Sequence, residues 1–412
     1  MFTRIFQPLI TVLLLIGMTG YSSNAQEVIS DKGNPSNLIV KELQAPQPIA
    51  ERRIFDQAKR QGGILDSNAA QAIEKVIKWK IYRMTLIKER VRIGKHRRDI
   101  LLDLHDASGQ GRIRRFQTEV ARNIAKYAPE LFDNHSLVRL NAMALLATLP
   151  PDLIEIGIPA MVSELENDDQ TEEVKLCACL GITNTAKQGF RNVTRKTQAI
   201  STVVTFLKKN HSATDWTKVR AIQALRALGR KRITRREIEP VIEVLVNIMR
   251  SGTESPMVQV EAAGAIATMD MSDLDLNCPL LAHELASLAA RLGRLYVEKY
   301  DDIEGSTEIN YWRLHFAKLV LSFRGTTTDP GSGLLNIARS KNQFDTVKSA
   351  EEVVIPVARM VVGEEFVDDV SDSVTTLEQW LSDNRPSDRH LTPDLAPLPE
   401  NSDRVAVRNE SN

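Results

Sequence analysis

Few residues in this chain have the types and spacing that catalysis or metal binding needs. His283-Glu284 begins like a zinc-binding helix, but no second histidine follows at the required spacing. The carboxylates of Asp301, Asp302 and Glu304 could attract Ca²⁺, although their spacing supplies no alternate ligands and indicates an acidic turn between helices. The sequence has no phosphate-binding glycine loop and no nucleophile elbow. We therefore predict no catalytic residue, no metal ion and no cofactor, and hence a protein that is not an enzyme.

The three cysteines and His315 are better explained as packing residues than as reactive or metal-binding residues. Cys177 and Cys179 are two positions apart on a predicted helix, so their side chains point about 200° apart and are poorly placed to bond to each other. Cys278 is alone, and His315 lies on an aromatic stripe. Because free cysteine is among the most buried residue types, we expect these side chains in the core or at its edge.

Charge is unevenly distributed along the chain, and this distribution says more about function than the histidines and cysteines do. Between Lys75 and Arg115 there are 13 Lys and Arg against four Asp and Glu, whereas residues 351–412 hold 14 acidic against five basic residues. The usual interpretation is a pair of solvated faces, or contact between the two ends within one chain or between two chains. The functional interpretation is a basic surface for a polyanion or an anionic membrane. Its candidate binding residues are Lys88, Arg90, Arg92, Arg97 and Arg98.

Composition favours a helical fold. The chain has 412 residues with 53 Lys and Arg and 53 Asp and Glu, so its formal net charge is zero, which argues against nucleic acid as a partner. Hydrophobic residues make up 42% of the chain and aromatic residues 5%, enough for a large core but unfavourable for sheet. No segment alternates apolar and polar residues over a sustained length. The predicted fold class is all-α.

The first residues match a secretory signal peptide. Arg4 gives a short basic start, an apolar run covers residues 9–16, and small residues precede Ala25. The run is shorter than the roughly 20 residues of a membrane-spanning helix. We therefore predict cleavage between Ala25 and Gln26 and a secreted or periplasmic protein. An uncleaved N-terminal membrane anchor is the alternative.

Four similar segments give the strongest structural signal. They align on alanines that lie 36, 43 and 41 residues apart, namely Ala142, Ala178, Ala221 and Ala262. An amphipathic stretch precedes each, at residues 113–127, 158–166, 194–209 and 238–250. The spacing predicts stacked helix pairs of about 40 residues. Small residues, including Gly181 or Gly264, are expected where the helices approach closely.

The second helix of each predicted pair resembles that of HEAT repeats, an armadillo-like helical family, over about residues 113–270. Val138, Arg139, Ala142 and Leu146 match its Val-Arg-x-x-Ala-x-x-x-Leu pattern well. The resemblance implies a right-handed α-α superhelix (a solenoid) whose second helices line the side on which partners dock. HEAT motifs are degenerate, so the resemblance bears on architecture more than on function.

The basic position of this pattern supplies further candidate binding residues. They are Arg139, Lys175, Lys218 and, beside the aligned position, Arg220. In the family the basic residue often bonds instead to an Asp of the neighbouring repeat, and we favour that role for Arg139 and Lys175. The acids that could accept such a bond are Asp133, Asp168 or Asp169, Asp215 and, in the fourth unit, only Glu254.

The regions around the repeats complete the expected organisation. An apolar stripe from Ile73 to Val91 predicts a long helix before the repeats, and further stripes predict helices after them. The expected units are a signal peptide (1–25), a flexible lead-in (26–48), a basic helical region (49–112), the repeats (113–270), a C-terminal helical extension or cap (271–383) and a disordered tail (384–412).

Three functions remain open. The first is an exported, non-enzymatic scaffold that binds another protein through the solenoid. The second is a module that binds a polyanion or a membrane or envelope surface through residues 75–115. The third is an enzyme resembling the HEAT-like lyases that handle bilin chromophores, although no convergent site supports it. The sequence leaves the oligomeric state open.

Overall fold

The computed structural model describes residues 41–61, 65–105, 114–230, 234–271, 274–300, 303, 305–326, 332–363 and 367–399. Within these ranges the chain is helical and contains no β-strand, so the all-α prediction is confirmed. The predicted signal peptide and the possible Ca²⁺ ligands Asp301, Asp302 and Glu304 lie outside the described residues.

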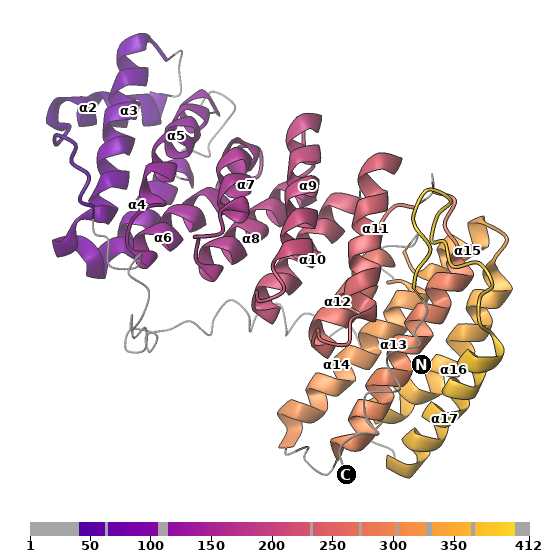
Figure 1. Cartoon of the computed structure of the whole chain (residues 1–412). Helices are drawn as coiled ribbons and strands as arrows, with labels where there is room; N and C mark the ends of the chain where they lie inside the picture. The colour runs from indigo at the N-terminus through magenta and orange to yellow at the C-terminus, as the bar shows by residue number, and fades with distance from the viewer. Residues whose placement is uncertain are drawn as a thin grey trace.

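The helices form two stacked layers in an elongated molecule (Figure 1). The first layer consists of α3 (Ser67–Tyr82), α5 (Arg114–Tyr127), α7 (Ile158–Glu166), α9 (Val193–Lys209), α11 (Arg235–Arg250) and α13 (Cys278–Glu298). The second consists of α4 (Ile93–His105), α6 (Ser136–Ala147), α8 (Glu172–Gln188), α10 (Asp215–Gly229), α12 (Pro256–Ile266) and α14 (Gly305–Arg324). Each second-layer helix packs on the next one in the layer.

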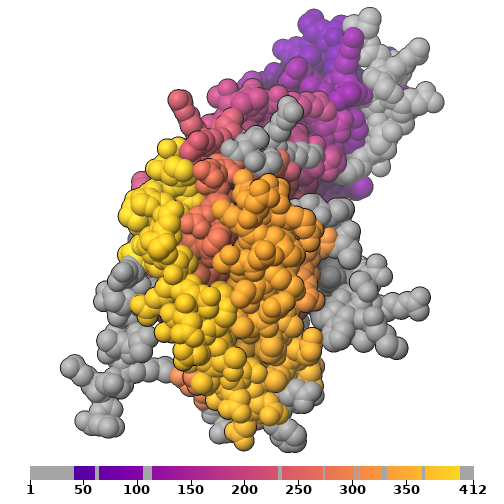
Figure 2. Space-filling view, turned by 90° about the vertical axis from the view of Figure 1, so that its right-hand side faces the viewer, coloured from indigo at the N-terminus to yellow at the C-terminus, as the bar shows by residue number. Residues whose placement is uncertain are grey.

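Shorter helices and the two ends complete the array. The 3₁₀ helices are η3 (Arg83–Thr85), η4 (Ile87–Arg92), η5 (Ala128–Leu131) and η6 (Ile154–Gly157), the last of which joins α5 to α7. At the N-terminal end, α2 (Ile49–Gln61) covers α3. At the other end α15 (Leu334–Ser340), α16 (Phe344–Gly363) and α17 (Val367–Asp383) pack on α13 and α14. Figure 2 looks onto these yellow and orange helices, with the indigo N-terminal residues at the far end of the molecule.

Local sequence signals explain where the helices begin. The side chain of Asp66 accepts a hydrogen bond from the backbone N–H of Ala69 at 2.7 Å and so caps α3. Thr234 and Glu237 form a reciprocal capping box at the start of α11. Asn277 caps α13 in the same manner as Asp66, through the N–H of Leu280 at 3.0 Å.

The aligned alanines lie where neighbouring helices meet. All four are fully buried, as the repeat predicted. Gly181 has the expected packing role, because a Cβ atom there would lie 2.5 Å from Sδ of Met161 and 3.1 Å from Cα of Ala147. Gly264 does not, since a Cβ atom there would meet nothing within 4 Å. The α5/α6, α7/α8, α9/α10 and α11/α12 pairs thus match the four expected units, and α3/α4 and α13/α14 extend the same two layers on either side.

The predicted long helix up to Val91 is interrupted. Helix α3 ends at Tyr82, and Leu86 adopts an extended conformation with φ −71° and ψ 126° between η3 and η4. The break changes which side of the following segment faces the core. Ile87 and Val91, expected on the buried stripe, are instead 58% and 87% exposed.

Part of each predicted loose end is packed. In the lead-in, the backbone N–H of Leu43 donates to Oγ1 of Thr85 at 2.9 Å. Residues 385–399, which we call the C-terminal strap, return across α13 and α11 without regular secondary structure. Leu391 and Leu398 are buried in the strap, and the carbonyl of Leu391 accepts from the N–H of Asn277 at 2.9 Å. The prediction of a disordered tail is therefore wrong for residues 384–399, while residues 400–412 lie outside the described part.

Candidate binding surfaces

The basic residues of the repeat pattern lie inside the array. Arg139, Lys175 and Lys218 are only 5–7% exposed, and Gln259 at the fourth aligned position is equally buried. A partner that docks on the second layer would therefore not reach their charges. Of the four candidates from the pattern, only Arg220 is accessible, and its guanidinium donates to Oε1 of Gln223 at 2.8 Å.

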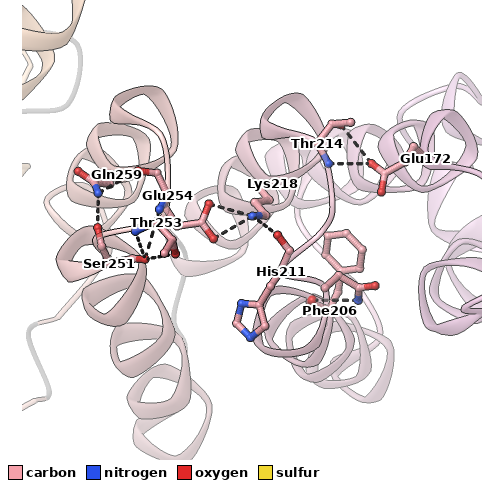
Figure 3. A network of polar contacts seen from close by, with 10 residues as sticks. Glu172, Phe206, His211, Thr214, Lys218, Ser251, Thr253, Glu254 and Gln259 are labelled. Atoms are coloured by element: carbon pink, nitrogen blue, oxygen red, sulfur yellow. Dashed lines mark hydrogen bonds and ion pairs between the residues drawn. The ribbon is translucent and has the colours of Figure 1, made fainter. Parts of the chain in front are cut away.

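Lys218 joins two successive repeats (Figure 3). Its ammonium group donates to the carbonyl of His211 at 2.8 Å and to both carboxylate oxygens of Glu254 at 2.8 and 2.9 Å. Glu254 lies in the turn before α12, and its own carbonyl accepts from the side chain of Gln259 at 3.1 Å. The bond between a basic residue and an acid of the next repeat is therefore present here, with Glu254 as the acid.

The two earlier repeats make different contacts. Arg139 donates to the carbonyl of Asn134 within its own turn, and Asp133, its expected acceptor, is exposed. The link between the second and third units comes from Glu172, whose carboxylate accepts from the hydroxyl of Thr214 at 3.1 Å (Figure 3). Lys175 is buried but forms no hydrogen bond or ion pair through its side chain with a described residue, so the predicted bond to Asp168 or Asp169 is absent there.

The accessible face of the second layer carries aromatic side chains at its C-terminal half. On α10, the residues that reach solvent follow helical spacing and include Trp216, Arg220 and Gln223. Trp216 is 62% exposed, and Tyr311 of α14 is 37% exposed. The sequence analysis did not select either residue. The available signal was a tryptophan four residues before Arg220 on the same helical face.

Contacts between α10, α12 and α14 position Tyr311. Burial and the charge of Asp215 on α10 raise the pKa of Tyr311, and the backbone of Met257, near the start of α12, lowers it slightly. Asp215 directly precedes Trp216 on α10, and α12 packs on both α10 and α14. Two turns further along α14, Lys318 pairs with Glu261 of α12 at 2.7 Å. We call the surface of Trp216, Arg220, Met257 and Tyr311 the aromatic face.

The basic candidates lie together at the N-terminal end. Lys88 and Arg92 of η4 and Arg98 of α4 are exposed, and Arg90 and Arg97 are half-buried. The charge of Arg97 partly offsets the rise that burial causes in the pKa of the Cys177 thiol on α8. The acidic helices α16 and α17 lie at the opposite end of the molecule (Figure 1). The basic and acidic regions therefore do not neutralise each other by contact within the described chain.

A shallow cavity of about 390 Å³ lies beside this basic region, between α2, α3 and α4. Its floor is Trp79, on which the guanidinium groups of Arg52 and Arg83 stack at 4.7 and 4.9 Å from the ring centre. Arg83 and His96 pair with Glu89 at 2.6 and 3.2 Å. Because these charges already pair with each other, the cavity offers a weak site for an added ion.

The described residues contain no group of three or more side chains suited to hold a metal ion. Glu284, next to His283 in the zinc-like dipeptide, is fully buried and pairs with Arg250 at 3.1 Å and with Arg389 of the strap at 3.6 Å. The three cysteines are free, and burial raises the pKa of Cys179 to about 12 and that of Cys278 to about 11. Such thiols are poor nucleophiles at neutral pH.

No helix in the described ranges has the length and apolar character that a bilayer crossing requires. No protein-family model, curated protein or solved structure matches this chain.

Proposed function

We propose that this chain is an exported, non-enzymatic scaffold of the HEAT-like type, which binds another protein on its aromatic face. In this proposal the two layers wind as a right-handed superhelix, and the first 25 residues are removed during export. The observation that carries the proposal is the exposure of Trp216 on α10 and of Tyr311 on α14, two helices of the second layer that both pack on α12.

Exposed aromatic side chains of this kind leave apolar surface in contact with water, which is unfavourable, and binding of a partner removes that surface from water. Tryptophan and tyrosine bury a large area with few rotatable bonds, and they are enriched among the residues that dominate binding energy. Here they flank Met257 and Arg220, both accessible in part, and methionine and arginine are also enriched at interfaces. The Lys218–Glu254 ion pair beneath this surface keeps α10 and α12 in register, so the aromatic face is rigid before a partner arrives.

The test is site-specific photocrosslinking in the organism that encodes the chain. A photoreactive phenylalanine analogue replaces Trp216 or Tyr311, and we expect both positions to yield the same light-dependent adduct with a second protein. Val193, which is 73% exposed on α9 of the first layer, is the matched control position and should yield none. Absence of adducts from both aromatic positions, or an identical adduct from position 193, would contradict the proposal.

A binding measurement with the captured protein sharpens the test. Trp216→Ala and Tyr311→Ala should each weaken binding by about tenfold or more, the effect typical of an aromatic residue at the centre of an interface. Arg220→Ala should have a smaller effect, because its guanidinium already bonds to Gln223.

A further inference from the structure

A stripe of basic and aliphatic residues runs along the exposed side of η4 and α4. The exposed positions follow each other at spacings of one and three along the 3₁₀ helix η4 and the first half of α4. We call this set the basic stripe, and its members are Ile87, Lys88, Val91, Arg92, Lys95 and Arg98.

The cations of the basic stripe have no counter-charge within the described chain. Lys88, Arg92, Lys95 and Arg98 form no ion pair or side-chain hydrogen bond with any described residue. Cations nearby behave differently, since Lys59 pairs with Asp103 at 3.1 Å and Arg83 with Glu89 at 2.6 Å. The fold thus pairs Lys59 and Arg83 and leaves the outer row without a counter-charge in the described chain. An unpaired row of one sign attracts a surface of the opposite sign.

The aliphatic members of the basic stripe indicate which anionic ligand it fits, a lipid surface or another polyanion. Val91 is 87% exposed and Ile87 58% exposed, and each lies directly beside a basic residue, Arg92 and Lys88. A polysaccharide or nucleic acid backbone gains nothing from contact with isolated aliphatic side chains. A bilayer accepts both groups, because aliphatic side chains enter the boundary between headgroups and acyl chains while Lys and Arg contact anionic headgroups.

We propose that the basic stripe docks the N-terminal end of the array on the surface of an anionic lipid bilayer. Ile87 and Val91 enter the interface, and Lys88, Arg92, Lys95 and Arg98 contact the headgroups. The acidic helices α16 and α17 at the far end are repelled by the same surface, so the elongated molecule stands away from the membrane (Figure 1). The aromatic face, which lies between the two ends, stays accessible in this orientation.

The test is co-sedimentation with vesicles of phosphatidylcholine alone or mixed with phosphatidylglycerol. Because the apolar run of residues 9–16 would itself partition into lipid, the chain that begins at Gln26 is used. We expect binding only to the anionic vesicles, and we expect high salt to weaken it steeply. No binding to anionic vesicles at low salt would overturn the proposal.

Two matched pairs of variants assign the effect to the basic stripe. Reversal of three cations in the stripe (Lys88→Glu, Arg92→Glu and Lys95→Glu) should reduce partitioning by about a hundredfold or more, because each cation contributes roughly fivefold near an anionic surface. The control reverses three exposed cations elsewhere that form no ion pair with a described residue (Lys187→Glu, Arg191→Glu and Lys209→Glu) and has the same net charge. An equal loss in the control would attribute binding to net charge and overturn the proposal.

The aliphatic contribution is tested in the same assay. Val91→Ser should weaken binding several-fold, whereas Val193→Ser, at a similarly exposed valine on α9, should not. The basic stripe would be a general polyanion site, not a lipid site, if Val91→Ser bound vesicles unchanged and if soluble dextran sulfate bound as tightly as the vesicles. Circular dichroism of each variant verifies that the helices remain folded.

Discussion

The two ends of the array differ in how they use charge. At the C-terminal end, acidic side chains are buried against cations: Glu351 is 1% exposed between Arg324 and Lys348, and Glu284 lies between Arg250 and Arg389. At the N-terminal end, the outer cations are exposed and unpaired in the described chain. Both ends use inner ion pairs to hold helices together, such as Lys59 with Asp103 at the N-terminal end, and the N-terminal end in addition presents to its surroundings a row of cations that are unpaired among the described residues. Charged residues therefore have different roles at the two ends of the same array.

The same contrast extends to apolar side chains. Helix α17 buries Val370, Val374 and Leu377 and exposes a polar outer side, as a terminal cap of a repeat array should. The segment after α3 exposes Ile87 and Val91 instead. The C-terminal end therefore presents a polar side to solvent, and we call it the closed end. The N-terminal end exposes aliphatic side chains beside cations that are unpaired in the described chain, and we call it the open end.

The largest predicted effect concerns the buried charge of the closed end. Glu284→Ala should lower the free energy of unfolding by about 3–5 kcal/mol, because it leaves the buried Arg250 without its carboxylate partner. Urea denaturation measures this change. Asp372→Ala, on the exposed side of α17, is the control and should change the value by less than about 0.5 kcal/mol. Equal effects would mean that buried ion pairs do not hold this end together.

A second prediction concerns pH. Burial lowers the pKa of His315 to about 4, while Lys318 and Glu261 act on it in opposite directions. As pH falls below about 6.5, His315 becomes protonated in the unfolded chain, whereas in the folded chain it stays neutral down to about pH 4. The free energy of unfolding therefore falls by about 3 kcal/mol over this window. His315→Gln should reduce the loss in urea denaturation at neutral and acidic pH. His211→Gln, at an exposed histidine, should leave the loss as large as in the parent protein.

The link between repeats should give a smaller effect. Lys218 and Glu254 are both largely buried, so a double-mutant cycle with Lys218→Met and Glu254→Gln should yield a coupling energy of about 1–2 kcal/mol in urea denaturation. Arg220→Ala on the accessible side of the same helix should change stability by less than about 0.5 kcal/mol. A coupling energy near zero would indicate that apolar packing alone sets the stacking of these repeats.

The smallest effect is expected at the open end. Reversal of Lys88, Arg92 and Lys95 to Glu should change the free energy of unfolding by less than about 0.5 kcal/mol per site, because these side chains contact no charged partner in the described chain. Thermal and urea denaturation both measure it. A loss comparable to that of Glu284→Ala would show that the two ends use charge alike and would remove the contrast drawn above.

The repeat could be predicted because its signals are local. Apolar spacing near 3.6 and the aligned alanines depend on residues within one or two turns, and the four helix pairs appear where these signals place them. The burial of Lys218, which the sequence analysis predicts as a binding residue, depends on contacts between repeats that a local pattern does not encode. The exposure of Trp216 could not be predicted, because it depends on which side of α10 the neighbouring helices leave uncovered.

Two failures have specific physical causes. The break at Leu86 comes from one residue in an extended conformation, which an apolar pattern does not encode. The strap has few apolar residues and several prolines, which are typical of disorder. It is ordered because Arg389 and Leu391 find partners on α13 and just before it, more than a hundred residues earlier in the chain. Contacts of that separation leave no trace in a local pattern.

The strap also determines the order in which the helices of the array unfold. In a linear stack each repeat is held only by its neighbours, so unfolding can start at either end and spread. The contacts of the strap with Asn277, Arg250 and Glu284 tie the end of α17 back to α11 and α13, so these elements must open together. At the N-terminal end the lead-in makes hydrogen bonds, from Asn134 to the carbonyl of Lys41 at 2.6 Å and from Leu43 to Thr85 at 2.9 Å, but no described residue of the lead-in forms a buried ion pair like that of Arg389 with Glu284. Amide hydrogen exchange should therefore proceed from the N-terminus inward, with the slowest amides in α13.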